Sequence, residues 1–360
     1  MASLSGDVEN TQDVIVNSRV ANGRRAHKFL LGALLLMSLL SVSIGPVDVS
    51  LWIVLQKLFM GQSLTLLEHV IFCDIRLPRL LMGICVGSAL AVSGAVMQGL
   101  FRNPLADPGL VGVSAGAGVG AIVAIVLGGL LPVFINSIFG DYLVIFSAFL
   151  GGWISAIILY RIATRHGQTS VATMLLAGIA IGALAGAISG LLIYMSDDKQ
   201  LRDLTFWGLG SLAGATWTKV MGAGPLMLIS IGIASTLGRG LNGLSLGEAT
   251  AAHIGISTQR LKNISICTVA AATGAAVAVS GSIGFIGIIV PHLLRKMIGP
   301  DHRTLIINSG FLGAIILIFS DIISRVITAP SELPIGIVTA ILGSPVFLWI
   351  LLRKRNASIW

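Results

Sequence analysis

The sequence has little charge. Of its 360 residues only 11% are Asp, Glu, Lys or Arg, whereas 55% are hydrophobic, and the mean hydropathy is +0.95. Soluble globular chains carry about 25% charged residues, so a soluble enzyme or a soluble binding module is excluded. The apolar residues form long continuous runs, not the alternating segments of about ten residues that a membrane barrel requires. The composition therefore indicates a polytopic membrane protein built from helices.

Motifs that carry chemistry are also missing. No Gly-Lys dipeptide occurs, so the chain has no GxxxxGK[ST] phosphate loop, and there is no HExxH. The three cysteines, Cys73, Cys85 and Cys267, lack CxxC spacing and are expected to be structural thiols. The sequence thus predicts no catalytic residue, no metal site and no cofactor bound by this chain. Any ATP and Mg would belong to a partner.

Ten apolar runs follow one another along the chain, and about 20 apolar residues suffice to cross a bilayer as a helix. The runs are at 29–46, 80–100, 111–131, 142–161, 171–195, 220–237, 262–281, 283–298, 305–324 and 335–352. We therefore expect an all-α polytopic membrane protein of ten transmembrane helices over residues 29–352. Residues 1–28 and 353–360 are expected to form polar tails.

Basic residues predict the orientation of these spans. With the N-terminus inside, sixteen of the 23 Lys and Arg residues lie in cytosolic segments, where such residues accumulate. Both tails are then cytosolic, and so is the polar segment 238–257 between the sixth and seventh runs. A net charge of +8 does not indicate a nucleic-acid partner, because the basic residues are dispersed between apolar runs.

The polar segment, residues 238–257, is the long interruption in the middle of the chain. Helical spacing gives it one apolar side, made of Leu241, Leu244, Leu246, Ala249, Ala252 and Ile254. Because the chain has no phosphate loop of its own, this side is predicted to dock a soluble partner that supplies force. The alternative is an amphipathic segment that lies on the bilayer surface.

Glycines recur at every fourth position of the fifth run, at Gly178, Gly182, Gly186 and Gly190. This spacing places them on one helix face and allows another backbone to approach closely. The stripe is explained either by helix packing alone or by a face that lines or flanks a pathway.

Arginines mark the predicted outer side. Arg76 and Arg79 flank a proline at the start of the second run, and Arg325 ends the ninth. Their guanidinium groups suit capture of carboxylates on an acidic partner, although Arg at a helix end also reaches toward lipid headgroups. Asp321 lies one turn before Arg325 and is expected to pair with it. No carboxylate is predicted at mid-span, which disfavours a proton-coupled carrier but leaves open a Na⁺ site built from backbone carbonyls.

Four blocks of sequence carry a family resemblance: residues 76–118, 241–256, 280–303 and 331–351. They resemble the FecCD-type permeases, which are membrane subunits of ABC importers for iron chelates, haem and cobalamin. The resemblance implies a type II permease fold in the bacterial inner (cytoplasmic) membrane. It also implies a second copy of this chain, two cytosolic ATPase subunits and a periplasmic substrate-binding protein as partners.

The resemblance further assigns roles to residues. The positions of the polar segment that match the family's ATPase-coupling pattern are Leu244, Gly247, Glu248, Ala251 and Gly255. The arginines that match those meeting acidic residues of the binding protein are Arg76, Arg79 and Arg325. The fifth and tenth runs would line a central pathway at the dimer axis.

Residues 103–117 and 200–217 look more like the haem permeases of the family than the siderophore or cobalamin permeases, so haem is the expected cargo. A siderophore or cobalamin remains an alternative. Two other classes also remain open at this point: an ion-gradient-driven secondary transporter, and a structural or receptor-like membrane subunit.

Overall fold

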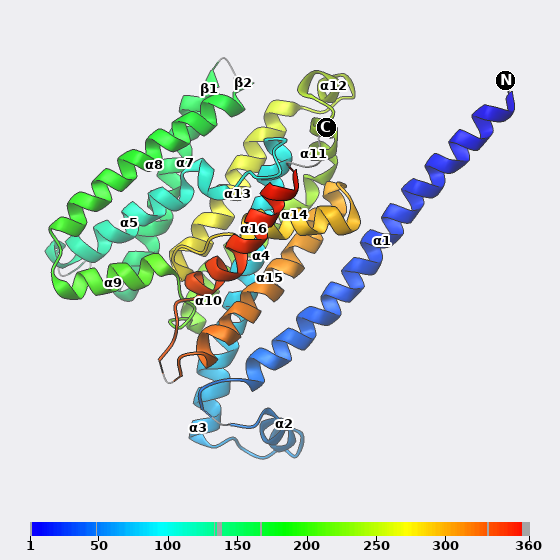
Figure 1. Cartoon of the computed structure of the whole chain (residues 1–360). Helices are drawn as coiled ribbons and strands as arrows, with labels where there is room; N and C mark the ends of the chain where they lie inside the picture. The colour runs from blue at the N-terminus through cyan, green and yellow to red at the C-terminus, as the bar shows by residue number, and fades with distance from the viewer. Residues whose placement is uncertain are drawn as a thin grey trace.

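The apolar runs fold into long helices that lie beside one another in a bundle (Figure 1). The structure is a computed structural model, and it describes residues 2–47, 49–132, 134, 139–165, 168–329 and 331–354. The predicted all-α architecture is confirmed. In the described part, the strands are a two-residue antiparallel pair, β1 (Thr164–Arg165) and β2 (Gln168–Thr169).

The helices follow in chain order. The first half contains α1 (Ala2–Ser43), α2 (Leu51–Phe59), α3 (Leu66–His69), the π-helix η1 (Val70–Arg76), α4 (Leu77–Leu100), the 3-10 turn η2 (Pro108–Val111), α5 (Val113–Leu127), the 3-10 turns η3 (Gly128–Leu130) and η4 (Gly140–Tyr142), and α7 (Leu143–Ala163). The second half contains α8 (Val171–Tyr194), α9 (Asp198–Leu209), α10 (Trp217–Thr236), α11 (Gly238–Ser245), α12 (Glu248–His253), α13 (Thr258–Ser280), α14 (Ile286–Ile298), α15 (His302–Val326) and α16 (Ile335–Lys354).

Eight helical stretches of the described residues are long and apolar enough to cross a membrane, so ten is an approximate number of spans. The predicted eighth run, 283–298, is the clearest difference. Its helix α14 has only 13 residues, or about 20 Å, which does not cross a hydrocarbon core of about 30 Å. Gly281 has φ +70° and Phe285 has φ 69°, so the chain breaks its helix between α13 and α14. The tenth run forms α16, of which Ile335–Ile350 is the apolar part.

The predicted tail boundary at residue 28 is not a break in the helix, because α1 continues from Ala2 to Ser43. At the other terminus, α16 extends to Lys354, and residues 355–360 of the predicted C-terminal tail lie outside the described residues.

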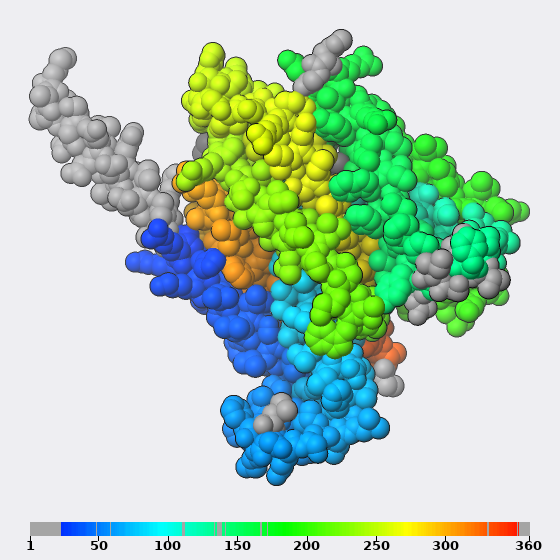
Figure 2. Space-filling view, turned by 180° about the vertical axis from the view of Figure 1, so that it is seen from behind, coloured from blue at the N-terminus to red at the C-terminus, as the bar shows by residue number. Residues whose placement is uncertain are grey.

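The two ends of the bundle differ in what they carry (Figure 1). One end carries α11, α12 and the β1–β2 pair, and the other carries residues 49–76, which we call the cap. Figure 2 shows the cap, in light blue, protruding from the bundle. The polar segment and the cap therefore lie at opposite ends, as the predicted topology requires.

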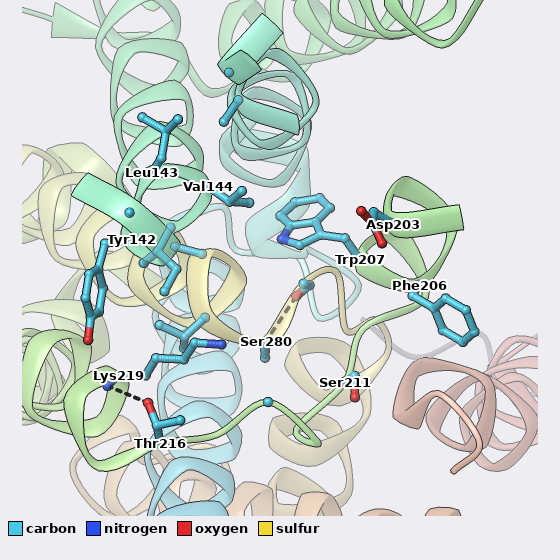
Figure 3. A pocket seen from close by; sticks show the side chains of 18 of the residues that line it. Tyr142, Leu143, Val144, Asp203, Phe206, Trp207, Ser211, Thr216, Lys219 and Ser280 are labelled. Atoms are coloured by element: carbon cyan, nitrogen blue, oxygen red, sulfur yellow. Dashed lines mark hydrogen bonds between the residues drawn. The ribbon is translucent and has the colours of Figure 1, made fainter. Parts of the chain in front are cut away.

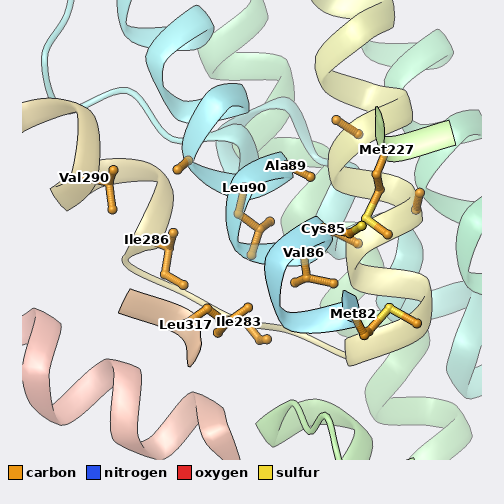
Figure 4. Packing of buried hydrophobic residues seen from close by; sticks show 14 of the residues in the cluster. Met82, Cys85, Val86, Ala89, Leu90, Met227, Ile283, Ile286, Val290 and Leu317 are labelled. Atoms are coloured by element: carbon orange, nitrogen blue, oxygen red, sulfur yellow. The ribbon is translucent and has the colours of Figure 1, made fainter. Parts of the chain in front are cut away.

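Helix α4 forms the centre of the bundle. Nineteen of its residues are buried, and in Figure 4 its side chains Met82, Val86 and Leu90 lie among residues of the surrounding helices, such as Met227 of α10 and Leu317 of α15. Helices α4 and α15 approach closely where two glycines meet. A Cβ added to Gly87 would lie 2.5 Å from the carbonyl oxygen of Gly313.

The helix that contains α4 begins earlier than the sequence indicates. The predicted second run starts at residue 80, whereas the continuous helical stretch runs from Leu66 to Leu100. Thr65 caps its first turn, and Glu68 completes a capping box. The polar residues before residue 80 kept this part out of the predicted apolar run, and Glu68 in the first turn is paired with Lys57 of α2 at 2.7 Å.

Candidate functional site

The polar segment folds as two short helices, α11 and α12, joined by a tight turn. Gly247 has φ +106° and Gly255 has φ +84°, and residues other than glycine rarely adopt such backbone angles. The amide of Gly247 donates to the carbonyl of Leu244 at 3.0 Å, and the amide of Ala251 donates to Gly247 at 2.9 Å. The two glycines are thus required by the shape of the segment.

The apolar side predicted for docking is divided by the structure. Leu241, Leu244 and Ala251 are at most 1% exposed, and the two leucines belong to a core cluster with α4, α13 and α15. Leu246 and Ile254 are 66% and 59% exposed. Of the six side chains predicted to form one docking side, the bundle buries two, Leu241 and Leu244, so these two do not face a partner. Leu244 and Ala251 anchor the segment, and Leu246 and Ile254 remain available to a partner.

Glu248, the first residue of α12, does not stand alone. Its carboxylate is half-exposed and lies 2.8 Å from the Nζ atom of Lys262, which is buried. The same Nζ donates to the carbonyl of Thr169 at 3.0 Å. Sequence reasoning used Lys262 only as a topology signal and missed this role, because the polar start of α13 gives no sign that this one lysine is buried.

A second link joins the polar segment to α15. The side-chain amide of Asn242 donates to Asp301 at 2.6 Å, and its oxygen accepts from the amide of His302 at 2.9 Å. Asp301 caps α15 by accepting from the amide of Arg303. The polar segment is therefore tied to the start of the helix that packs along α4.

At the cap end, Arg79 and Arg325 share one carboxylate. The Nε and Nη2 atoms of Arg79 lie 2.9 Å from Oδ1 of Asp321, and Nη1 donates to Glu332 at 2.7 Å. Nη2 of Arg325 lies 3.1 Å from Oδ2 of Asp321, which confirms the predicted pair one turn apart. Arg325 also donates to the carbonyl of Ser41 at 3.2 Å. Both arginines are almost completely buried.

Arg76 is buried as well. Its Nη1 donates to the carbonyl of Val42 at 2.7 Å and its Nη2 to that of Val47 at 2.8 Å. The three predicted docking arginines thus lie at one end, and each is only 4–5% exposed. Arg79 is held by carboxylates, whereas the end of α1 and the following loop supply carbonyl partners to Arg76 and Arg325 that no sequence pattern reveals. A docking role for them stays a prediction.

The glycine stripe of α8 is partly free of contacts. Gly178 is buried, whereas a Cβ added to Gly182, Gly186 or Gly190 would meet nothing within 4 Å. Packing within this chain therefore does not explain these three glycines. Their face is therefore open to a second copy or to a pathway.

A cavity of about 1280 Å³ opens among the ends of α5, α7, α9, α10 and α13 (Figure 3). Trp207, Asp203 and Phe206 reach it from α9, and Lys219 reaches it from α10. Helix α9 precedes α10, and Trp217 at the start of α10 donates its indole N–H to the carbonyl of Cys73 at 2.7 Å. Among the described residues, no three His, Cys, Asp or Glu side chains lie together as a metal site requires.

Comparisons with known proteins agree with this arrangement. Residues 33–353 match the model of the FecCD transport family. The hemin transport system permease protein HmuU of Yersinia pestis is 42% identical over 338 residues, which cover 93% of this chain and 98% of that protein. The cobalamin import system permease protein BtuC of Halobacterium salinarum is 40% identical over 288 residues, covering 80% of this chain and 74% of that one.

A solved structure is also similar. It is an inward-facing conformation of a metal-chelate type ABC transporter, with a TM-score of 0.79 and 31% identity, covering 91% of this chain and 99% of that chain. The sequence match and the fold thus point to the same conclusion: the chain belongs to the FecCD transport family and is an ABC importer permease.

Proposed function

We propose that two copies of this chain form the membrane pathway of a haem importer in a bacterial inner membrane. Two ATPase subunits would dock on the polar segment from the cytosol, and a periplasmic binding protein would deliver cargo at the cap end. The observation that carries this proposal is the exposure of Leu246 and Ile254 on a rigidly held segment opposite the cap. Apolar side chains exposed at the tip of a bundle mark a protein-interaction site.

Force reaches the bundle through the buried part of the segment. Leu241 and Leu244 fix α11 in the core, and Asn242 fixes it to the start of α15. A partner that moves Leu246 or Ile254 therefore moves helices of the bundle and not a loose loop. ATP and Mg are bound by the partner in this scheme.

Haem is the proposed cargo because the hemin permease HmuU matches along almost the whole of this chain. The cobalamin permease BtuC is nearly as similar over a shorter length, so another bulky chelate is the alternative. The open glycine face of α8 would lie toward the second copy and the pathway between them.

The orientation follows from the basic residues, with both termini cytosolic. Gly23, where the first span begins, lies against Thr304 at the start of α15, close to the polar segment. Helix α16 ends at the same end of the bundle (Figure 1). Both termini and the polar segment are therefore proposed to share the cytosolic side.

The test is uptake by the reconstituted complex. Liposomes that contain this chain and its ATPase receive haem-loaded binding protein outside and ATP inside, and trapped haem is measured. The proposal expects uptake that requires hydrolysable ATP and survives an ionophore. Uptake without nucleotide that an ionophore abolishes would show an ion-gradient carrier, and cobalamin uptake with no haem uptake would correct the cargo.

A further inference from the structure

Lys262 joins three elements that are distant in sequence. It lies in the second turn of α13, and its side chain is only 4% exposed. Its ammonium donates to Glu248, the first residue of α12, and to the carbonyl of Thr169, the last residue of β2. Ser170, the next residue, caps the N-terminus of α8. One buried cation thus connects the polar segment to the start of α8.

Thr169, which lies just before α8, is hydrogen-bonded to side chains of α13 through its amide, its hydroxyl and its carbonyl. The amide of Thr169 donates to Gln259 Oε1 at 3.1 Å, and its hydroxyl accepts from Gln259 Nε2 at 2.9 Å. Its carbonyl accepts from Lys262 at 3.0 Å. Gln259 is itself fixed by a bond to Asn263 at 2.8 Å. The first turn of α8 therefore cannot shift relative to α13 unless these bonds break.

Of these side chains, Lys262 is the one that also binds α12. Among the described residues, Glu248–Lys262–Thr169 is the hydrogen-bonded chain that leads from the polar segment to the turn before α8. Helix α8 carries the open glycine face, at Gly182 and Gly186, that we assign to the dimer and pathway side. Because the residues of a helix move together, a displacement of the first turn of α8 also displaces the face that carries these glycines.

A buried ammonium is costly to desolvate, and one half-exposed carboxylate compensates it poorly. An apolar side chain of similar length would fill the same space without that penalty. Packing alone therefore does not account for a lysine at this position.

We propose that Lys262 is a positioning residue that transmits movement of α12 to α8 and so couples ATP hydrolysis to the pathway. This inference rests on the proposed function, in which the ATPase docks on the polar segment. It assigns no contact with cargo or nucleotide to Lys262 itself.

The test is Lys262→Met in the full complex of permease, ATPase and binding protein in liposomes. Methionine keeps the length of the side chain but removes both hydrogen bonds. We expect the ATPase to co-purify as with the wild type and to hydrolyse ATP. The ratio of cargo transported to ATP hydrolysed is expected to fall about tenfold or more, a typical size for coupling between sites. Lys262→Arg, which retains a donor, is expected to restore part of this ratio.

Three further variants make the result specific. Glu248→Gln combined with Lys262→Met is expected to be no worse than Lys262→Met alone, since both act through one link. Lys57→Met removes the Lys57–Glu68 pair at the cap end, which at 2.7 Å is similar in length to the 2.8 Å pair of Lys262, and is expected to leave the ratio unchanged. Gln259→Leu removes the other two bonds to Thr169, and is expected to lower the ratio even if Lys262→Met fails to fold.

A wild-type ratio in Lys262→Met or in Gln259→Leu would overturn the inference. Loss of ATPase binding in Lys262→Met would also overturn it, because the residue would then only shape the docking site. Absence of ATP-driven uptake by the wild-type complex is a different failure, which would refute the proposed function and this inference with it.

Discussion

Asp321 is predicted to be the most important single side chain for stability at the cap end. It is 3% exposed and lies between two buried guanidinium groups, those of Arg79 and Arg325. Asp321→Asn keeps the shape and removes the charge. Removing one partner of a buried ion pair costs about 3–5 kcal/mol, because the remaining charge stays buried without compensation. Arg79 retains Glu332, so we expect a loss near the lower limit, about 3 kcal/mol.

Glu332→Gln is the matched control. It removes a carboxylate from the same cluster, but this carboxylate is 31% exposed, and pairs accessible to solvent contribute only about 0–1 kcal/mol. The assay is unfolding of the purified chain by sodium dodecyl sulfate in mixed micelles, followed by circular dichroism. If Asp321→Asn loses no more free energy of unfolding than Glu332→Gln, the cluster does not hold this end of the bundle together and the reasoning is wrong.

Three further predictions concern other parts of the molecule. Leu246 is exposed, so Leu246→Ala is expected to weaken ATPase binding by more than about 1 kcal/mol without a change in stability. Leu244 is buried, so Leu244→Ala is expected to lower the free energy of unfolding by about 2–5 kcal/mol. Co-purification of the ATPase measures the first effect, and unfolding of the purified chain measures the second. Gly87→Ala forces a Cβ against a backbone carbonyl and is expected to lower the free energy of unfolding by about 1–3 kcal/mol. The Cβ of Gly186→Ala meets nothing within this chain, so this variant is expected to raise the free energy of unfolding of the isolated chain by up to about 1 kcal/mol. Burial raises the pKa of Asp107 above its ordinary value, and the hydrogen bond from the amide of Gly109 opposes this shift. The folded protein therefore favours the protonated carboxyl, and the stabilisation that this gives is complete at low pH and is lost as the pH rises through the folded pKa. Asp107→Asn should therefore remove a decline in unfolding midpoint that begins above about pH 4, and an unchanged pH profile would refute this.

Hydropathy predicted the class and most of the helices of this protein, because burial in lipid requires long apolar runs. It failed where helices are short or begin with polar residues. Helix α14 is 13 residues long because the chain turns at Gly281 and Phe285. The gap between the predicted runs 262–281 and 283–298 indicated a break there, but not that the turn shortens the second helix below the length of a span. The stretch before α4 is helical from Leu66, but its charged residues kept it out of the apolar run that predicted this helix from residue 80.

The candidate sites were predictable in position but not in exposure. Spacing placed Arg76, Arg79 and Arg325 at one end, and the pair of Arg325 with Asp321 followed from helical geometry. The burial of Arg76 depends on carbonyls at the end of α1 and in the following loop, more than 25 residues away in sequence, so no local pattern contains it. Leu244 and Leu246 show the same limit, because amphipathic spacing ranks them together and only tertiary packing separates them.

The polar segment is the part on which the whole account depends, and its side of the membrane is directly measurable. Thr250 is exposed on α12, so a cysteine introduced there in a variant without the three native cysteines reports access at that position. We predict labelling by a membrane-impermeant maleimide in inverted inner-membrane vesicles, protection when the ATPase is bound, and no labelling in intact cells with a permeabilised outer membrane. Labelling in those cells would place the segment outside, and no cytosolic ATPase would then drive this permease through it.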